Sequence, residues 1–150
     1  EQNLPLVLIM PAGGADGEYS DYCRTIAPEG TLFLTAPPQD VVRSAFHAAR
    51  AFAQPGLSEL PGVATLTAAL AGLPIAVTDR GTTWDYLGPR VRYCEPDDLD
   101  SISEALQRAL ALGPDPNLKK ELLLKYSWGK IVMIMIKLYR KLGALKNCGA

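Results

Sequence analysis

Short apolar runs alternate with stretches of helical periodicity along this chain, a pattern typical of βαβ proteins. The apolar runs predict strands at residues 6–10, 31–34, 51–53, 75–77 and 91–94. Apolar residues at intervals of three and four predict helices at residues 17–27, 41–49, 62–71, 99–112, 117–125 and 128–142. We expect Asp40 to cap the second helix, and Asp98 and Asp100 to place negative charge at the start of the fourth.

This alternation predicts an α/β fold, a three-layer Rossmann-like parallel sheet of about five strands with C-terminal helices. With right-handed crossovers we expect the strand order 2-1-3-4-5, with the first strand buried on both faces. The length predicts a single domain over residues 1–150. Ligands of such sheets bind beyond the carboxyl ends of the strands, so residues 11–14 and 55–62 should lie on one rim.

Composition narrows the classes of partner. The content of 48% apolar and 21% charged residues indicates a globular protein. The net charge of −1 gives no positive electrostatic potential that would attract nucleic acid. No apolar run approaches the length of a transmembrane helix. Cys23, Cys94 and Cys148 are far apart and form no C-x-x-C, which favours reduced thiols, no metal site and a cytoplasmic location. The missing initiator Met suggests that the chain was cut from a longer one.

The segment after the third strand carries the candidate chemistry. Glu59 lies on a short loop, and Pro61 and Gly62 open a helix of small residues. The free backbone N–H groups and the positive dipole at a helix N-terminus suit a phosphate. A carboxylate beside them can accept hydrogen bonds from sugar hydroxyls. Together these features indicate a nucleotide-sugar site, with Gly13 and Gly14 on the same rim.

Several residues have a plainer interpretation beside the functional one. Gly62 also suits a tight turn into the helix, and Thr67 suits packing on the helix surface. His47 is more typical of a surface histidine than of a catalytic one. Arg80 is positioned to bind a phosphate, or else to lie in solvent as a turn residue. Residues 131–136 are apolar all round their helix, which predicts exposed apolar surface and an interface along the helix from Lys130 to Leu142.

Four segments resemble the retaining GT-B glycosyltransferases of the sucrose-synthase and glycogen-synthase-like group. The strongest is PGLSELPGVATLTAALAGLPIAVTDRGTTWDYLG, residues 55–88, which resembles their donor-site region. LVLIMPAGG, YCEPDDLDSISEALQRAL and KYSWGKIVMIMIKLYRKL resemble, in the same order along the chain, further parts of their C-terminal domain. The resemblance therefore covers nearly the whole chain.

The resemblance implies a role for each site residue. Glu59 would be the catalytic-site carboxylate that contacts hydroxyls of the donor sugar. The backbone amides around Gly62, Val63 and Ala64 would hold the distal phosphate. Thr35 and Ala36 would lie against the base, and Thr67 stands where the family's second glutamate grips the ribose. The implied donor is a nucleotide-diphosphate sugar, and neither a metal nor another cofactor is required.

Two departures from the family leave three interpretations open. Thr67 replaces the second glutamate, and the upstream βα unit with the basic diphosphate clamp is missing, as is the N-terminal acceptor domain. The chain can be the donor-binding domain of a transferase, or a non-catalytic module that assembles through the helix between Lys130 and Leu142. It can also be one subunit of a split transferase. Activity of this chain alone, and a peripheral place at a membrane, stay undecided.

Overall fold

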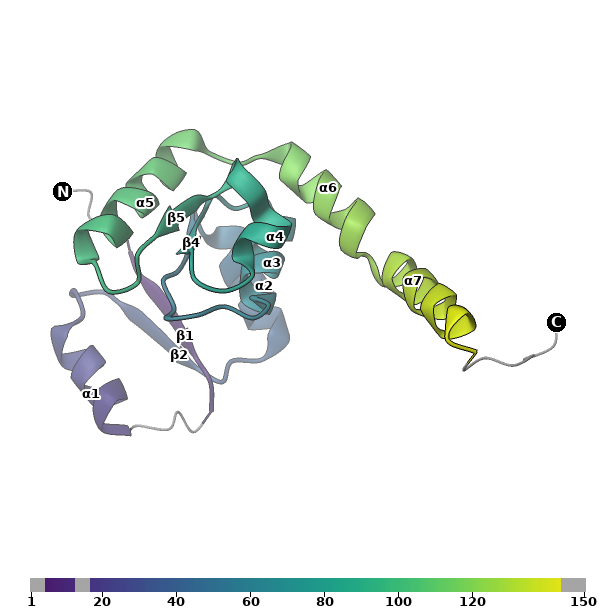
Figure 1. The fold of residues 1–150 in the computed structure, drawn as a ribbon. Helices are drawn as coiled ribbons and strands as arrows, with labels where there is room; N and C mark the ends of the chain where they lie inside the picture. The colour runs from purple at the N-terminus through teal and green to yellow at the C-terminus, as the bar shows by residue number, and fades with distance from the viewer. Residues whose placement is uncertain (1–4, 13–16, 144–150) are drawn as a thin grey trace. The chain divides into compact units, whose positions relative to one another are not determined.

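The computed structural model describes residues 5–12 and 17–143, which fall into two compact units. Unit 1 extends to Ala48, and unit 2 begins at Ala49. All strands of the described residues are short and paired in parallel, and the C-terminal segment is helical (Figure 1). The predicted α/β class with a parallel arrangement and C-terminal helices is therefore confirmed.

Unit 1 is a parallel strand pair with two helices. Its elements are β1 (Val7–Met10), α1 (Gly17–Ile26), β2 (Leu32–Thr35) and α2 (Gln39–Ala48). The register of the pair sets Val7 opposite Leu32 and Met10 opposite Thr35. The prediction that β1 is buried on both faces is wrong, because Val7 and Ile9 are each 43% exposed. Within unit 1 this strand has a neighbour on one side only, so its side chains lack the surroundings of a central strand.

The start of α2 also differs from the prediction. Asp40 was expected at the cap, but the helix already begins at Gln39 and Asp40 lies in its first turn. The reason is that the carbonyl of Pro38 accepts the first helical hydrogen bond, from the Val42 amide at 3.1 Å. The Asp40 carboxylate is still well placed there, since negative charge near a helix N-terminus is favourable.

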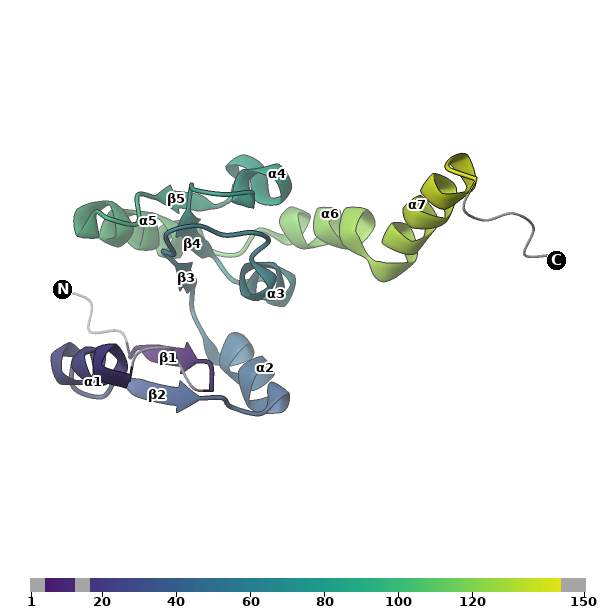
Figure 2. The same cartoon turned by 60° about the horizontal axis from the view of Figure 1, so that its bottom comes forward.

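Unit 2 is a three-stranded parallel sheet with helices packed on it and a helical C-terminal segment that extends away from it (Figure 2). The strands are β3 (Phe52–Gln54), β4 (Ile75–Thr78) and β5 (Arg92–Cys94), with β4 in the middle and fully buried. The helices are α3 (Val63–Ala71), α4 (Thr83–Leu87), the 3-10 turn η1 (Gly88–Arg90), α5 (Leu99–Leu112), α6 (Pro116–Tyr126) and α7 (Trp128–Lys141).

The core of unit 2 forms where α5 packs on β4 and β5. Ala76 and Cys94 from the strands meet Ala105 and Ala109 from α5, with Ile102 and Leu106 packed around them. Burial raises the pKa of the Cys94 thiol, and the charges of Asp79 and Glu95 add to this effect. Cys94 is therefore a packing residue, and Cys148 lies outside the described residues.

The predicted single sheet of five strands is wrong. The described strands form two sheets, β1 with β2 and β3 with β4 and β5, and no ladder joins β1 to β3 among these residues. Within each sheet the neighbours are those of the predicted order 2-1-3-4-5.

Capping residues determine where helices of unit 2 begin and end. The Asp98 carboxylate accepts hydrogen bonds from the amides of Asp100 and Ser101, which begins α5. Asp115 does the same for α6, and Gly72, with φ of 87°, ends α3. No helix among the described residues combines the length and the apolar character that crossing a bilayer demands.

Candidate functional site

Glu59 is held at the carboxyl edge of the unit 2 sheet by its own backbone. The Glu59 amide donates to the carbonyl of Arg80 at 3.2 Å, and the Thr82 amide donates to the carbonyl of Glu59 at 3.0 Å. These bonds form an isolated parallel bridge between Glu59 and Gly81, just beyond the ends of β3 and β4. The loop that carries Glu59 is thus fixed where ligands of parallel sheets bind.

Two glycines make room for Glu59. Gly81 has φ of +108°, and a Cβ there would lie 2.3 Å from the carbonyl oxygen of Glu59. A Cβ on Gly62 would lie 2.6 Å from Oε2 of Glu59 and 2.8 Å from Oγ1 of Thr65. The first glycine allows the close approach of the two loops. The second lets the Glu59 carboxylate lie directly against the residue that precedes α3.

The N-terminus of α3 is open to an anion. Its cap residue is Gly62, which has no side chain to accept a hydrogen bond, and the first turn holds no acidic residue. The amides of Val63 and Ala64 lie in that turn, where no intrahelical acceptor exists. The helix dipole adds partial positive charge at the same place. These two amides can therefore bind an oxyanion, while the Gly62 amide is already engaged.

The partner of the Gly62 amide is the phenol of Tyr86, a residue of α4 that the sequence did not single out. The amide donates to the Tyr86 oxygen at 3.1 Å. Partial burial raises the pKa of Tyr86; the Gly62 amide acts to lower it, and the charge of Glu59 acts to raise it. Tyr86 follows Gly62 by 24 positions on a helix of 5 residues, so no local pattern pointed to it.

The hydroxyl of Thr65 lies at the same helix start, and the sequence did not indicate it either. Thr65 is 0% exposed, and its Oγ1 has no hydrogen-bond partner among the described residues. It lies next to Gly62, as the distance to a Cβ on that glycine shows. In the sequence Thr65 is one of several small residues in an apolar helix. Only the structure shows that its hydroxyl is buried and unpaired.

Thr67 lies on α3, one turn after Val63. It is half-buried, and its hydroxyl donates to the Val63 carbonyl at 2.8 Å. The proton is thus used within the helix, as is common for threonine, and only the oxygen lone pairs remain for a ligand. Its position against a ribose stays a prediction.

The remaining predicted site residues belong to unit 1 or lie outside the described residues. Thr35 ends β2, and Arg24 donates to its hydroxyl over a long 3.5 Å. Ala36 has a positive φ of 44°, unusual for a residue with a side chain, and its amide donates to the Met10 carbonyl at 2.8 Å. Gly13 and Gly14 fall outside the described residues. The structure therefore brings together Glu59 and the start of α3, all within unit 2.

The sequence also offered two basic candidates. His47 is exposed in the last turn of α2, as expected of a surface histidine. Arg80 contacts Oε2 of Glu95 at 3.0 Å and Oδ2 of Asp97 at 2.9 Å. The hydrogen bonds with Glu95 and then Asp97 raise the pKa of Arg80. The Arg80 guanidinium is exposed but paired with two carboxylates, which neutralise it locally. Among the described residues no three His, Cys, Asp or Glu side chains gather in a way that would hold a metal ion.

Solved structures provide the comparison that decides the fold. The sucrose-phosphate synthase of Thermosynechococcus elongatus matches 93% of this chain with a TM-score of 0.78 at 19% identity. The catalytic domain of starch synthase IV from Arabidopsis thaliana, bound to ADP and acarbose, matches 91% with a TM-score of 0.70 at 16% identity. AviGT4, a glycosyltransferase involved in avilamycin A biosynthesis, matches 95% with a TM-score of 0.71 at 21% identity. This chain has the fold of the C-terminal portion of retaining GT-B glycosyltransferases.

The expected resemblance is therefore confirmed at the level of the fold. The chain spans 38% of the sucrose-phosphate synthase, 32% of the starch synthase and 44% of AviGT4. Neither the family models nor the curated proteins match the sequence. Within this fold, Glu59, Gly62 and Tyr86 form a cluster at the carboxyl edge of the three-stranded sheet.

Proposed function

We propose that this chain binds a nucleotide-diphosphate sugar and serves as the donor-binding part of a GT-B glycosyltransferase. The observation that carries the proposal is the position of the Glu59 carboxylate against Gly62, at an α3 N-terminus without a side-chain cap. This arrangement offers backbone donors for a phosphate and, beside them, an acceptor for sugar hydroxyls. The starch synthase of the same fold was solved with ADP, which supports a nucleotide as the ligand class.

In this proposal, residues of unit 2 each bind a different part of the ligand. The amides of Val63 and Ala64 bind the distal phosphate, and the α3 dipole stabilises the negative charge that develops on the leaving diphosphate. Glu59 accepts hydrogen bonds from hydroxyls of the sugar and so orients it for transfer. Thr67 offers its oxygen to the ribose. The reaction is transfer of the sugar with retention of configuration, onto an acceptor held by a further domain or subunit.

A thermal-shift panel tests the proposal. Wild type and Glu59→Gln are melted with UDP, GDP, ADP and their common sugar conjugates at millimolar concentration. A ligand that binds only the folded state raises the melting temperature by mass action. We expect one nucleotide family to stabilise the wild type, with a smaller shift for its sugar conjugate in Glu59→Gln. A flat panel for the wild type contradicts the proposal.

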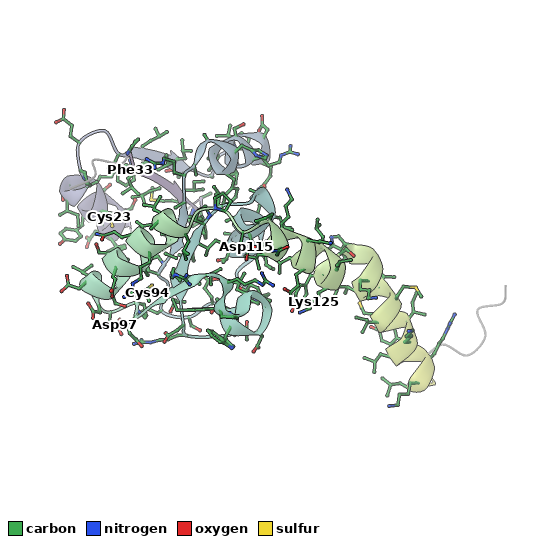
Figure 3. All side chains as sticks on the ribbon, turned by 90° about the horizontal axis from the view of Figure 1, so that it is seen from above. Cys23, Phe33, Cys94, Asp97, Asp115 and Lys125 are labelled. Carbon is green, nitrogen blue, oxygen red and sulfur yellow. The ribbon has the colours of Figure 1, made fainter. Side chains whose placement is uncertain are left out.

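The exposed surface of α7 favours a second candidate function, that of an assembly module. No side chain of α7 is buried, and Met133 and Ile134 are each 54% exposed. Side chains project from all around this helix, beyond the labelled Lys125 of α6 (Figure 3). A groove of about 520 Å³ lies at the junction of α6 and α7. Its lining consists of Leu123, Leu124, Ser127, Gly129, Lys130, Met133, Ile134 and Lys137.

Exposed apolar patches of this kind mark interfaces, so α7 is proposed to pack against a partner. The partner is an acceptor-binding domain, a second subunit or another copy of this chain. Light scattering over a range of concentrations tests the last of these cases. A homo-oligomer that dissociates when Met133 and Ile134 are both changed to Glu supports self-assembly through α7. A monomer at the highest concentration contradicts self-assembly and leaves the other two partners.

A further inference from the structure

The phenol of Tyr86 has one hydrogen-bonding group that the fold does not use. Its oxygen accepts the hydrogen bond of the Gly62 amide at 3.1 Å, so its own proton is left to donate. Within the described part of the chain no acceptor lies in hydrogen-bond range of this proton. The phenol is only partly buried and lies at the N-terminus of α3, so a ligand bound there can reach it.

Thr65 provides a second, independent sign that this helix start is built for a ligand. Its hydroxyl is fully buried, unpaired and adjacent to Gly62. A buried hydroxyl without a partner is unfavourable for folding, and native proteins contain few of them. Two hydroxyls with unused hydrogen-bonding capacity, from α3 and α4, therefore meet at the residue that precedes α3.

The charges around this position favour recognition by neutral donors. Arg80 is engaged with Glu95 and Asp97, and the Glu59 carboxylate lies against Gly62, so no unpaired basic side chain takes part at this helix start. An anionic oxygen bound by the amides of Val63 and Ala64 lies within about one helical turn of the Tyr86 hydroxyl, because Gly62 adjoins both. Since burial raises the pKa of Tyr86, the phenol keeps its proton at neutral pH and above.

We propose that Tyr86 is a ligand-contact residue whose hydroxyl donates a hydrogen bond to the distal phosphate of a bound nucleoside diphosphate. Tyr86 would then make the site select diphosphates over monophosphates, without a basic side chain. The inference rests on the proposed function, since it adds a residue to the same site.

The test is calorimetry of the whole chain with UDP, GDP and ADP and with UMP, GMP and AMP, for wild type and Tyr86→Phe. The substitution keeps the ring and removes the oxygen that accepts the hydrogen bond of the Gly62 amide, and a thermal melt verifies folding. A hydrogen bond to a charged phosphate corresponds to a loss of about tenfold in affinity. We expect that loss for the best diphosphate and a change of less than about twofold for its monophosphate.

Tyr93→Phe is the matched control. Tyr93 is also a half-buried tyrosine, with burial that raises its pKa to about 12, but its hydroxyl donates to the Gly88 carbonyl at 2.8 Å. This variant should bind both classes of nucleotide as the wild type does.

Three results would overturn the inference. If wild type and Tyr86→Phe bind the diphosphate equally, Tyr86 does not contact the phosphate, and the proposed function stands. If Tyr86→Phe weakens monophosphate and diphosphate by the same factor, the residue acts through the fold of α3 and not on the distal phosphate. If the wild type binds none of the nucleotides, the proposed function and the inference both fail.

Discussion

The Glu59 carboxylate occupies the space that a side chain on Gly62 would need, with Oε2 2.6 Å from the position of that Cβ. This contact places the acidic group beside the N-terminus of α3. It also makes the geometry of Glu59 sensitive to the smallest substitution at Gly62, which gives a direct test of the site.

Gly62→Ala should displace the Glu59 carboxylate and destabilise unit 2. Gly62 has φ of −70°, which any residue adopts, but the new Cβ would lie 2.6 Å from Oε2 of Glu59 and 2.8 Å from Oγ1 of the buried Thr65. We expect a larger loss of affinity for the nucleotide sugar than for the free nucleoside diphosphate, and a loss of about 1–3 kcal/mol in the free energy of unfolding. Calorimetry and urea denaturation measure the two effects.

Gly56→Ala is the matched control for that substitution. A Cβ on Gly56 would meet Oε1 of Glu59 at 3.5 Å, an ordinary van der Waals distance. This variant should bind like the wild type. Equal loss of sugar binding in both variants would show that the loop, and not the position of the carboxylate, determines the effect.

Gly81→Ala should destabilise unit 2. The positive φ of +108° strains any other residue, and the new Cβ would lie 2.3 Å from the backbone oxygen of Glu59, which cannot move aside like a side chain. We expect a loss of about 2–3 kcal/mol in the free energy of unfolding. Gly72→Ala isolates the clash, because Gly72 has φ of +87° but no atom within 4 Å of its Cβ position. Equal losses in the two variants, measured by urea denaturation, would contradict the close approach.

Thr65→Val and Thr83→Val should change stability in opposite directions. Both threonines are 0% exposed, but the Thr83 hydroxyl donates to the Thr78 carbonyl at 2.9 Å, while the Thr65 hydroxyl is unpaired. Valine at 65 should stabilise by about 1 kcal/mol, and valine at 83 should destabilise by about 1–2 kcal/mol. Urea denaturation of the two variants measures both values. Destabilisation by Thr65→Val would show that its hydroxyl has a partner in solution.

The cap of α6 should make stability depend on pH in the acid range. Burial acts to raise the pKa of Asp115, but the hydrogen bond from Arg90 and those from the Asn117 and Leu118 amides lower it overall. For a carboxyl with a lowered pKa, the stabilisation is complete above the unfolded value of about 4 and is lost as pH falls through the folded value.

Asp115→Asn keeps a capping oxygen and removes the titration. The variant should therefore lose less stability than the wild type between pH 5 and pH 2 (about the range where a lowered aspartate titrates). Urea denaturation at several pH values measures the difference. Parallel pH profiles for the two proteins would show that the pair of Arg90 and Asp115 contributes nothing in solution.

The parts of the fold that depend on neighbouring residues could be predicted from the sequence. Helix α5 has the predicted bounds, because Asp98 begins it and Gly113 follows its last residue. The sequence also indicated the loop of Glu59 and the glycine before α3, because these features too depend only on neighbouring residues. By contrast, α4 has 5 residues, too few to show a helical period.

The parts that depend on contacts between distant residues could not be predicted. The division into two sheets reflects which strands pair, and no strand sequence here encodes its partner. The contact between Tyr86 and Gly62 joins positions 24 apart, and the unpaired state of Thr65 follows from burial under other elements. These are the residues that the structure adds to the candidate site.

The central claim is that Glu59 recognises the sugar of a nucleotide-diphosphate sugar. The most direct measurement is calorimetry of wild type and Glu59→Gln with the best nucleoside diphosphate and its sugar conjugate. Glutamine has the same shape and still fits against Gly62, so only the charge is lost. Glu104→Gln, at an exposed position of α5, serves as the control. The account predicts that Glu59→Gln binds the sugar conjugate about 5–10-fold more weakly and the diphosphate as the wild type does. Equal affinity of both proteins for the conjugate, or no binding by the wild type, would contradict it.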